Sequence, residues 1–163
     1  GYLDFHANAQ AQWNKVPFQM LIMPPINLSY FEQEETVSMM KDWEFLNDRQ
    51  VFWALSWDMN GKLLNRIPLI KKLKWREWLA IKGVYGHLTD KNNPFLEKNK
   101  NDDTIFLFPK GSDVMGNTPY WECVVGVHNI FKFFAVEYVR RLTYINRPGI
   151  HKGGVRFNFM MSF

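Results

Sequence analysis

The sequence predicts an all-β protein: an antiparallel transmembrane β-barrel, of which this chain forms the C-terminal half with about seven strands. Three observations lead to this prediction: regular alternation of polar and apolar residues at the start of the chain, the same alternation at its end, and the composition. Aromatic residues make up 17% of the 163 residues, yet the mean hydropathy is −0.30. A barrel wall that alternates lipid-facing and lumen-facing side chains, with aromatic girdles at both interfaces, has this unusual combination.

The first strand is predicted at residues 3–14, where apolar and polar side chains alternate without a break over twelve residues. Successive side chains of a strand point to opposite faces. Strands of soluble proteins usually have about five or six residues, whereas a tilted membrane strand needs about 9–11. The polar side chains of this strand are therefore candidates for facing the barrel lumen: Asp4, His6, Asn8, Gln10 and Gln12.

The last strand is predicted at the chain end, where large apolar residues again occupy alternate positions. A terminal strand that ends in Phe, with aromatic residues at alternate positions, is the signal that the barrel-assembly machinery of Gram-negative outer membranes recognises. A C-terminal strand of a soluble sandwich is the alternative interpretation. The residues that form the terminal barrel-strand signal are Gly154, Val155, Phe157, Phe159, Met161 and Phe163.

Five further strands are predicted between these two, at residues 25–33, 51–60, 78–87, 120–128 and 135–145. Polar residues of the later strands add Glu137, Arg141 and Arg156 to the candidate lumen-facing set. The connections alternate between apolar segments (16–21, 67–73 and 129–134) and polar ones (32–47, 89–118 and 146–153). Short turns on the periplasmic side and longer polar loops outside are typical of outer-membrane barrels, so the apolar connections are expected to be periplasmic.

Seven strands would leave two open edges, which lipid does not tolerate because the edge backbone groups have no hydrogen-bond partners there. Either one more strand lies within residues 34–43, or residues 1–163 form part of one larger barrel domain. We expect the second, in which the strand that ends at Phe163 pairs with an early strand that is not present in this chain.

Several separated stretches resemble one family. They are residues 65–77, 83–94, 129–134, 138–144 and 154–159. Together they resemble the C-terminal part of a family of Bacteroidota outer-membrane proteins of unknown function. Members of that family typically join a carboxypeptidase-regulatory-like domain to a barrel that is distantly similar to the surface-antigen and outer-membrane assembly superfamily. The resemblance implies an outer-membrane location and no established catalytic residues.

Catalytic, metal and nucleic-acid chemistry find little support in the sequence. The four histidines lack metal-ligand spacing, Cys123 is the single cysteine, and no nucleophile motif is present. The formal charge of +4 is too small to indicate nucleic-acid binding. We therefore expect a protein that is not an enzyme, has no cofactor or metal and binds no nucleic acid.

The predicted function is that of an integral outer-membrane β-barrel with a transport, assembly or accessory role in an outer-membrane complex. Its expected partners are the lipid bilayer, lipopolysaccharide, the barrel-assembly machinery during biogenesis and other outer-membrane proteins. A soluble ligand-binding β-barrel or sandwich is the alternative, and the end of a nutrient-receptor barrel is a third hypothesis.

Overall fold

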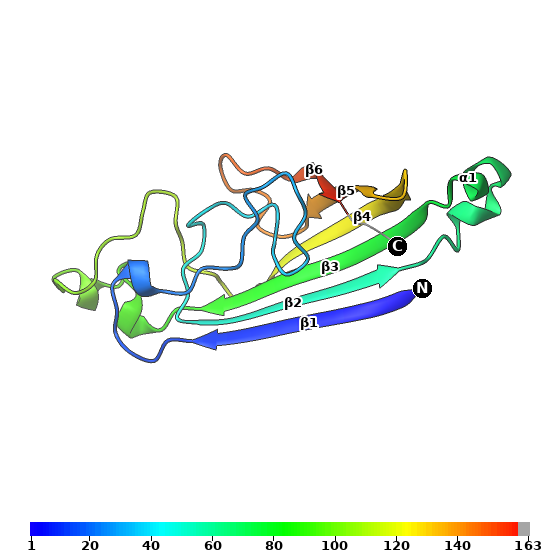
Figure 1. The fold of residues 1–163 in the computed structure, drawn as a ribbon. Coiled ribbons are helices and arrows are strands. Elements are labelled where there is room, and N and C mark those ends of the chain that lie inside the picture. Colours follow the sequence, from blue (N-terminus) through cyan, green and yellow to red (C-terminus); the bar gives the residue numbers. More distant parts are fainter. Residues whose placement is uncertain (160–163) are drawn as a thin grey trace.

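A computed structural model describes residues 1–159 of the chain. Six strands form one antiparallel sheet in the order β1-β2-β3-β4-β5-β6 (Figure 1). Their bounds are Tyr2–Ala11, Arg49–Asp58, Arg76–His87, Tyr120–Ile130, Phe134–Arg141 and Gly153–Phe159. The prediction of an all-β antiparallel fold is confirmed. The sheet is open, however, and does not close into a barrel within the described residues.

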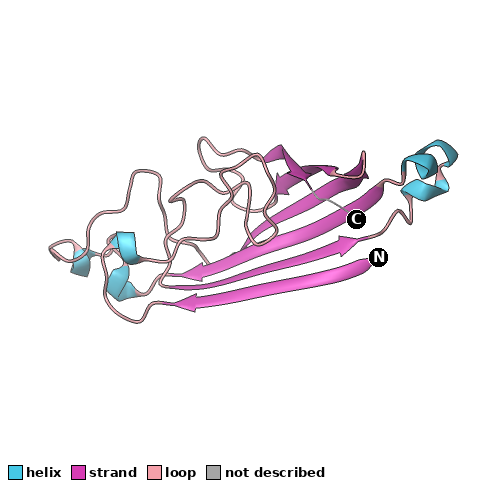
Figure 2. Ribbon diagram, in the orientation of Figure 1, coloured by secondary structure: helices cyan, strands magenta, loops and turns pink. Residues whose placement is uncertain are grey.

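Helical structure is confined to short pieces in the connections (Figure 2). One α-helix, α1, spans Pro68–Leu73, and four 3-10 turns lie at Phe18–Met20, Leu64–Arg66, Asp90–Asn92 and Glu97–Asn99. No helix in the described part of the chain is long and apolar enough to cross a membrane.

The two faces of the sheet have different surroundings. Residues 21–48, which we call the covering segment, arch over one face of the sheet (Figure 1). They bury apolar side chains of that face, including Phe52, Val84 and Tyr120, against Val37 and Phe45 of the segment. We call this the covered face. The opposite, bare face has no such layer, and large apolar side chains there are exposed.

The prediction of a strand at residues 25–33 was wrong. The prediction rested on Ile26, Leu28 and Tyr30 in phase, but residues of this stretch make single bridges only, Ile26 with Val37 and Phe31 with Phe157. The chain turns sharply because the Asn27 side chain accepts a hydrogen bond from the Ser29 amide (2.8 Å) and donates one to the Phe31 carbonyl (2.6 Å). An Asx turn of this kind competes with strand pairing.

The loss of that strand changes the number of strands and the position of one connection. Six strands are observed where about seven were predicted. The apolar stretch 16–21 and the polar stretch 32–47 both fall in the single connection from β1 to β2. Residues 16–21 therefore lie at the same end of the sheet as the polar connections, and the prediction that they lie with the other apolar turns was wrong.

Strand register determines which side chains share a face. The row His6, Ala54, Lys82, Glu122 and Arg141 crosses five strands on the covered face. The row Phe5, Leu55, Ile81, Cys123 and Arg140 crosses the same strands on the bare face. The register therefore places three charged residues of these rows on the covered face and one, Arg140, near the end of β5 on the bare face.

Candidate functional site: charged side chains beneath the covering segment

The strands place alternating charges side by side on the covered face. Lys82 of β3 pairs with Glu122 of β4, and Glu122 pairs with Arg141 of β5. Each of these three residues is at most 1% exposed. Charged side chains are seldom fully buried without partners, because removing a charge from water is costly. Their partners come from the covering segment.

Lys82 holds residues 32–36 of that segment. Its ammonium group forms a buried ion pair with Glu32 and donates hydrogen bonds to the carbonyl oxygens of Gln33 (3.0 Å) and Thr36 (2.9 Å). The second oxygen of Glu32 accepts a hydrogen bond from the Ser38 hydroxyl (2.8 Å). All three ammonium protons are thereby used, which is the full donor capacity of a lysine.

The side-chain carboxylate of Glu122 binds backbone amides in the middle of the segment. Its two carboxylate oxygens accept hydrogen bonds from the amides of Ser38 (2.8 Å) and Met39 (3.1 Å). The hydroxyl of Tyr120, two residues earlier on the same strand, donates a third (2.9 Å). Charge-assisted bonds to consecutive backbone amides fix the path of the chain at this point.

Arg141 forms the most extensive contact. Its guanidinium donates two parallel bonds to the Glu44 carboxylate, at 2.9 and 2.6 Å, one to the Met39 carbonyl (3.2 Å) and one to the Thr143 carbonyl (2.9 Å). It also lies over the Tyr120 ring, 4.9 Å from its centroid. A two-pronged arginine–carboxylate pair of this kind is both strong and geometrically specific.

The pair of His128 with Glu137, and the side chain of Arg156, are further polar groups of the covered face. The Nε2 atom of His128 lies 2.7 Å from the Glu137 carboxylate, and the imidazole stacks on Trp78 with ring centroids 5.1 Å apart. Arg156 of β6 donates a hydrogen bond to the Ser38 carbonyl (2.9 Å). Strands β3 to β6 therefore each contribute a charged side chain to the contact with the covering segment or to this buried pair.

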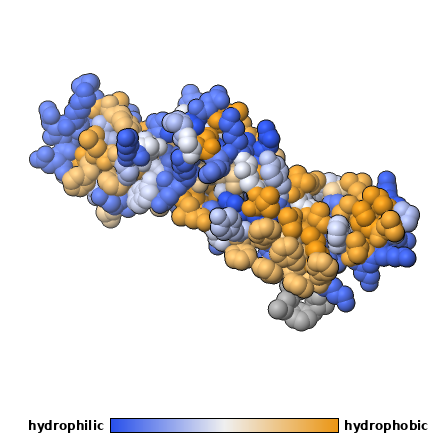
Figure 3. All heavy atoms as spheres, turned by 90° about the horizontal axis from the view of Figure 1, so that it is seen from above, coloured by the Kyte–Doolittle hydropathy of each residue, from blue (hydrophilic) through white to orange (hydrophobic). Residues whose placement is uncertain are grey.

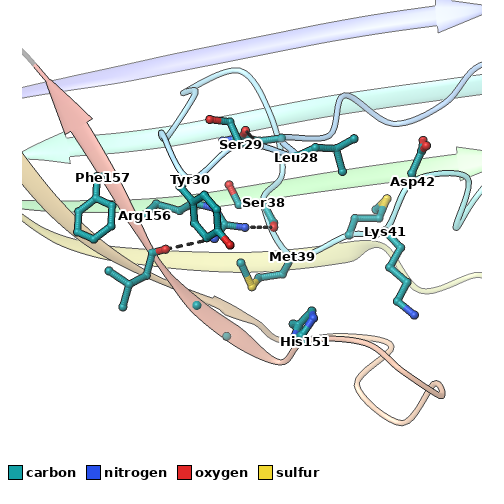
Figure 4. A pocket seen from close by; sticks show the side chains of 15 residues that line it. Leu28, Ser29, Tyr30, Ser38, Met39, Lys41, Asp42, His151, Arg156 and Phe157 are labelled. Atoms are coloured by element: carbon teal, nitrogen blue, oxygen red, sulfur yellow. Dashed lines mark hydrogen bonds between the residues drawn. The ribbon is translucent and has the colours of Figure 1, made fainter.

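A cavity of about 670 Å³ separates part of the segment from β6. Tyr30, Ser38 and Met39 line it from the covering segment, and Arg156 lines it from β6, with His151 nearby (Figure 4). The covering segment reaches the β6 edge here: the Glu32 amide donates to the Phe157 carbonyl, and the Phe157 amide donates to the Tyr30 carbonyl, both at 2.8 Å.

The far end of the segment is fixed by the connection from β5 to β6. The ring of Tyr144 packs on Phe45, with centroids 4.9 Å apart, and its hydroxyl donates to the Thr118 carbonyl (2.5 Å). Burial raises the pKa of the Tyr144 hydroxyl above its ordinary value, so the group remains a donor at neutral pH. The covering segment is therefore held both by the sheet and by the connection from β5 to β6.

The structure brings only some of the candidate lumen-facing residues together. Glu137, Arg141 and Arg156 lie on the covered face among the contacts described above. The β1 candidates Asp4, His6, Asn8 and Gln10 share that face by register. His6 contacts the covering segment, with its Nδ1 atom 3.5 Å from the Glu35 carboxylate, and Asp4 lines a small pocket with His6 and Glu35. Asp4, Asn8 and Gln10 are exposed. Gln12 lies beyond β1, where its amide donates to the Asp48 carbonyl.

Four charged residues of this site were missed by the sequence prediction: Lys82, Glu122, Glu32 and Glu44. A signal existed for the first two, because each is a charge within the covered face of a mainly apolar strand: Glu122 is the one Asp, Glu, Lys or Arg on that face of β4, and Lys82 lies in the middle of β3, whose other charge on that face, Arg76, is at the strand end. Nothing local distinguishes Glu32 and Glu44 from the neighbouring acidic residues of their connection.

The terminal barrel-strand signal falls partly within the described residues. Gly154, Val155, Phe157 and Phe159 lie in β6, where the three apolar side chains share the bare face. Met161 and Phe163 lie outside the described residues.

No group of three or more His, Cys, Asp and Glu residues within residues 1–159 is placed to hold a metal ion. Comparison of the chain with protein-family models, curated proteins and solved structures finds no match. Function must therefore be inferred from the geometry of the sheet and its covering segment.

Proposed function

We propose that this chain forms part of the wall of an integral outer-membrane β-barrel, with the covering segment folded into the lumen, and that the barrel serves transport, assembly or an accessory role in an outer-membrane complex. The observation that carries the proposal is the distribution of charge between the two faces. Buried ion pairs lie on the covered face, whereas the bare face exposes Leu3, Phe5, Val125 and Tyr138.

A soluble sandwich or barrel packs its apolar faces inside and turns polar side chains to water, whereas the apolar bare face of this sheet is exposed. Soluble monomers rarely expose large contiguous apolar surfaces. Across the described strands, Asp, Glu, Lys, Arg and His side chains on the bare face are few and lie near strand ends: Arg49, Glu77, His87 and Arg140. Lipid accounts for such a face more simply than water does.

Strand length supports the same proposal. Strands β1 and β2 have 10 residues each, β3 has 12 and β4 has 11. Ten residues rise about 34 Å, which at a tilt of about 40° spans about 26 Å, close to the apolar band of about 25 Å in outer-membrane barrels. We infer that additional strands complete the barrel, since the outer edge of β1 is unpaired in the described residues and lipid does not tolerate such an edge.

The charged side chains of the covered face give the covering segment a role within this proposal. They hold it against the wall as a fixed constriction or plug, and release of the segment would open the lumen. The inferred chemistry is positioning rather than catalysis, because the charged groups contact one another and the backbone of the segment.

The proposal is tested with protein recovered from the membrane fraction of producing cells. Extraction only with detergent, together with a heat-dependent change in gel mobility, is expected. A chain that stays folded and monomeric without detergent would instead support the alternative, a soluble ligand-binding β-barrel or sandwich.

One substitution on the bare face sharpens this test. Ile81→Arg places a cation in the middle of β3 on that face, and insertion into vesicles should become less favourable by about 2–4 kcal/mol. The matched control is Leu107→Arg, at an apolar residue that is 77% exposed outside the sheet. Equal insertion of the two variants would contradict a lipid-facing bare face.

A further inference from the structure

The connection from β2 to β3, residues 59–75, projects beyond the end of the sheet and carries α1 (Figure 1). We call it the basic turn. It contains five cations, Lys62, Arg66, Lys71, Lys72 and Lys74, and no Asp or Glu. All five are exposed, and none forms an ion pair with another residue between 1 and 159.

Two acidic residues flank the turn, Asp58 and Glu77, and within residues 1–159 neither forms an ion pair with these cations. The Asp58 carboxylate accepts a hydrogen bond from the backbone amide of Asn60 (2.6 Å). One oxygen of Glu77, at the start of β3, accepts hydrogen bonds from the backbone amides of Leu63 (2.9 Å) and Leu64. The carboxylate therefore fixes the path of the turn. The side-chain cations remain directed at whatever surrounds this end of the sheet.

The same turn exposes four large aliphatic side chains. Leu63 is 53%, Ile67 47%, Leu69 78% and Leu73 51% exposed. They alternate along the chain with the cations, so hydrophobic and hydrophilic residues lie side by side at this end of the molecule (Figure 3). Water alone favours the cations but not the aliphatic side chains.

The basic turn is continuous with the bare face. The ammonium group of Lys62 lies 6.0 Å from the centroid of the Trp57 ring, and Trp57 is the last bare-face residue of β2. An amphipathic tryptophan at the end of an apolar face is typical of the headgroup level of a membrane. A cation beside it would lie at the height of the lipid phosphates.

We propose that the basic turn binds the phosphate groups of anionic phospholipids at the membrane surface, with its leucine and isoleucine side chains inserted among the acyl chains. This inference rests on the proposed function. Clustered cations near a membrane attract anionic lipids, and apolar side chains on the same short segment add insertion to that attraction. The basic turn thereby anchors one end of the barrel wall at a defined depth.

The lipid is assigned to the periplasmic leaflet by the lengths of the connections. The opposite end of the sheet carries the long connections 12–48 and 88–119, and outer-membrane barrels place long loops outside and short turns inside. The basic turn shares its end with the three-residue turn 131–133 between β4 and β5. Phospholipid is therefore the expected source of the phosphate groups, rather than lipopolysaccharide.

The test uses the full chain in a neutral detergent, titrated with short-chain phosphatidylglycerol, with native mass spectrometry to count bound lipids. The variant Lys62→Gln/Lys71→Gln/Lys72→Gln removes three cations. Lys74 is left unchanged because its φ of 53° makes substitution there a backbone perturbation. Each lysine near an anionic membrane surface strengthens binding by about fivefold at low salt. Loss of three lysines should therefore weaken the affinity for phosphatidylglycerol about a hundredfold.

The matched control variant is Lys98→Gln/Lys100→Gln/Lys110→Gln, which removes three exposed cations from the connection 88–119. It should bind phosphatidylglycerol as the wild type does. Equal affinity of the two triple variants would overturn the proposal. Lipopolysaccharide bound in preference, and lost from the basic-turn variant, would also overturn it.

The heat-dependent gel shift is recorded for each variant, so failure to fold is recognised separately from failure to bind. A second variant, Leu69→Gln, keeps every cation and removes one inserted side chain; weaker lipid retention is expected, and unchanged retention would contradict insertion. If the wild-type chain proves stable and monomeric in water, the proposed function fails. If it inserts but shows no preference for anionic lipid, only this inference fails.

Discussion

The Arg141–Glu44 pair offers the sharpest test of how the covering segment is held. The two side chains are 0% and 2% exposed and are joined by two hydrogen bonds of 2.9 and 2.6 Å. Arg141→Met removes the cation and leaves the Glu44 carboxylate buried, with the amide of Lys41 at 3.0 Å and the guanidinium of Arg147 at 3.6 Å as its remaining partners.

The expected cost follows from the loss of the two-pronged counter-charge of this buried carboxylate. Breaking a buried ion pair by removing one partner destabilises a protein by about 3–5 kcal/mol. Adding Glu44→Gln removes the stranded charge, so the double variant should be more stable than the sum of the single variants predicts. Coupling energies between contacting residues reach about 0.5–3 kcal/mol, and this pair should lie in the upper half of that range.

The assay is urea unfolding of the wild type, both single variants and the double variant in the same neutral detergent. An exposed pair, Lys100 and Glu97, serves as the control, since surface ion pairs contribute about 0–1 kcal/mol. Additive effects of Arg141→Met and Glu44→Gln, or a cost of Arg141→Met no larger than that of Lys100→Met, would refute the assignment of Arg141 as the main attachment of the segment.

Three more outcomes follow from the contacts of the covered and bare faces. Lys82→Met leaves Glu32 buried without its cation, which should cost about 3–5 kcal/mol and speed cleavage after Glu32, which is buried in the wild type, by a glutamate-specific protease; a cleavage rate at Glu32 equal to that of the wild type would argue against this attachment. Gly83→Val should cost about 1–3 kcal/mol and change tryptophan fluorescence, because a Cβ there would overlap the Trp53 ring. Gly116→Val, in open surroundings, is its control. Asn27→Ala removes the Asx turn, and a loss of about 1–3 kcal/mol in the free energy of unfolding, measured by thermal unfolding, is expected because two part-buried hydrogen bonds, to the Ser29 amide and the Phe31 carbonyl, are lost.

The predictability of the strands has a simple physical basis. A strand turns its side chains to alternate faces, so the alternation at residues 3–14, 51–60 and 120–128 predicted β1, β2 and β4 to within a few residues. The same periodicity placed Glu137, Arg141 and Arg156 on one face. These are local properties, and each strand carries them without its neighbours.

The covering segment could not be predicted in this way. Residues 25–33 have the composition of a strand, but the side chain of Asn27 bends the chain before it can pair. A polar side chain that competes with the backbone for hydrogen bonds leaves no trace in the alternation of apolar residues. The prediction that residues 16–21 lie at the periplasmic end was wrong for the same reason. It came from counting strands back from the chain end, and that count included the strand at residues 25–33.

What the sequence alone determined is the pair of opposite faces on each strand, because the two-residue repeat of extended backbone is local. Only the tertiary structure decided which charges meet. Glu44 and Arg141 are 97 residues apart in the chain, and Lys82 and Glu32 are 50 apart. Such pairs form because the sheet register and the path of the covering segment bring them together, and the burial of one charge then requires the other.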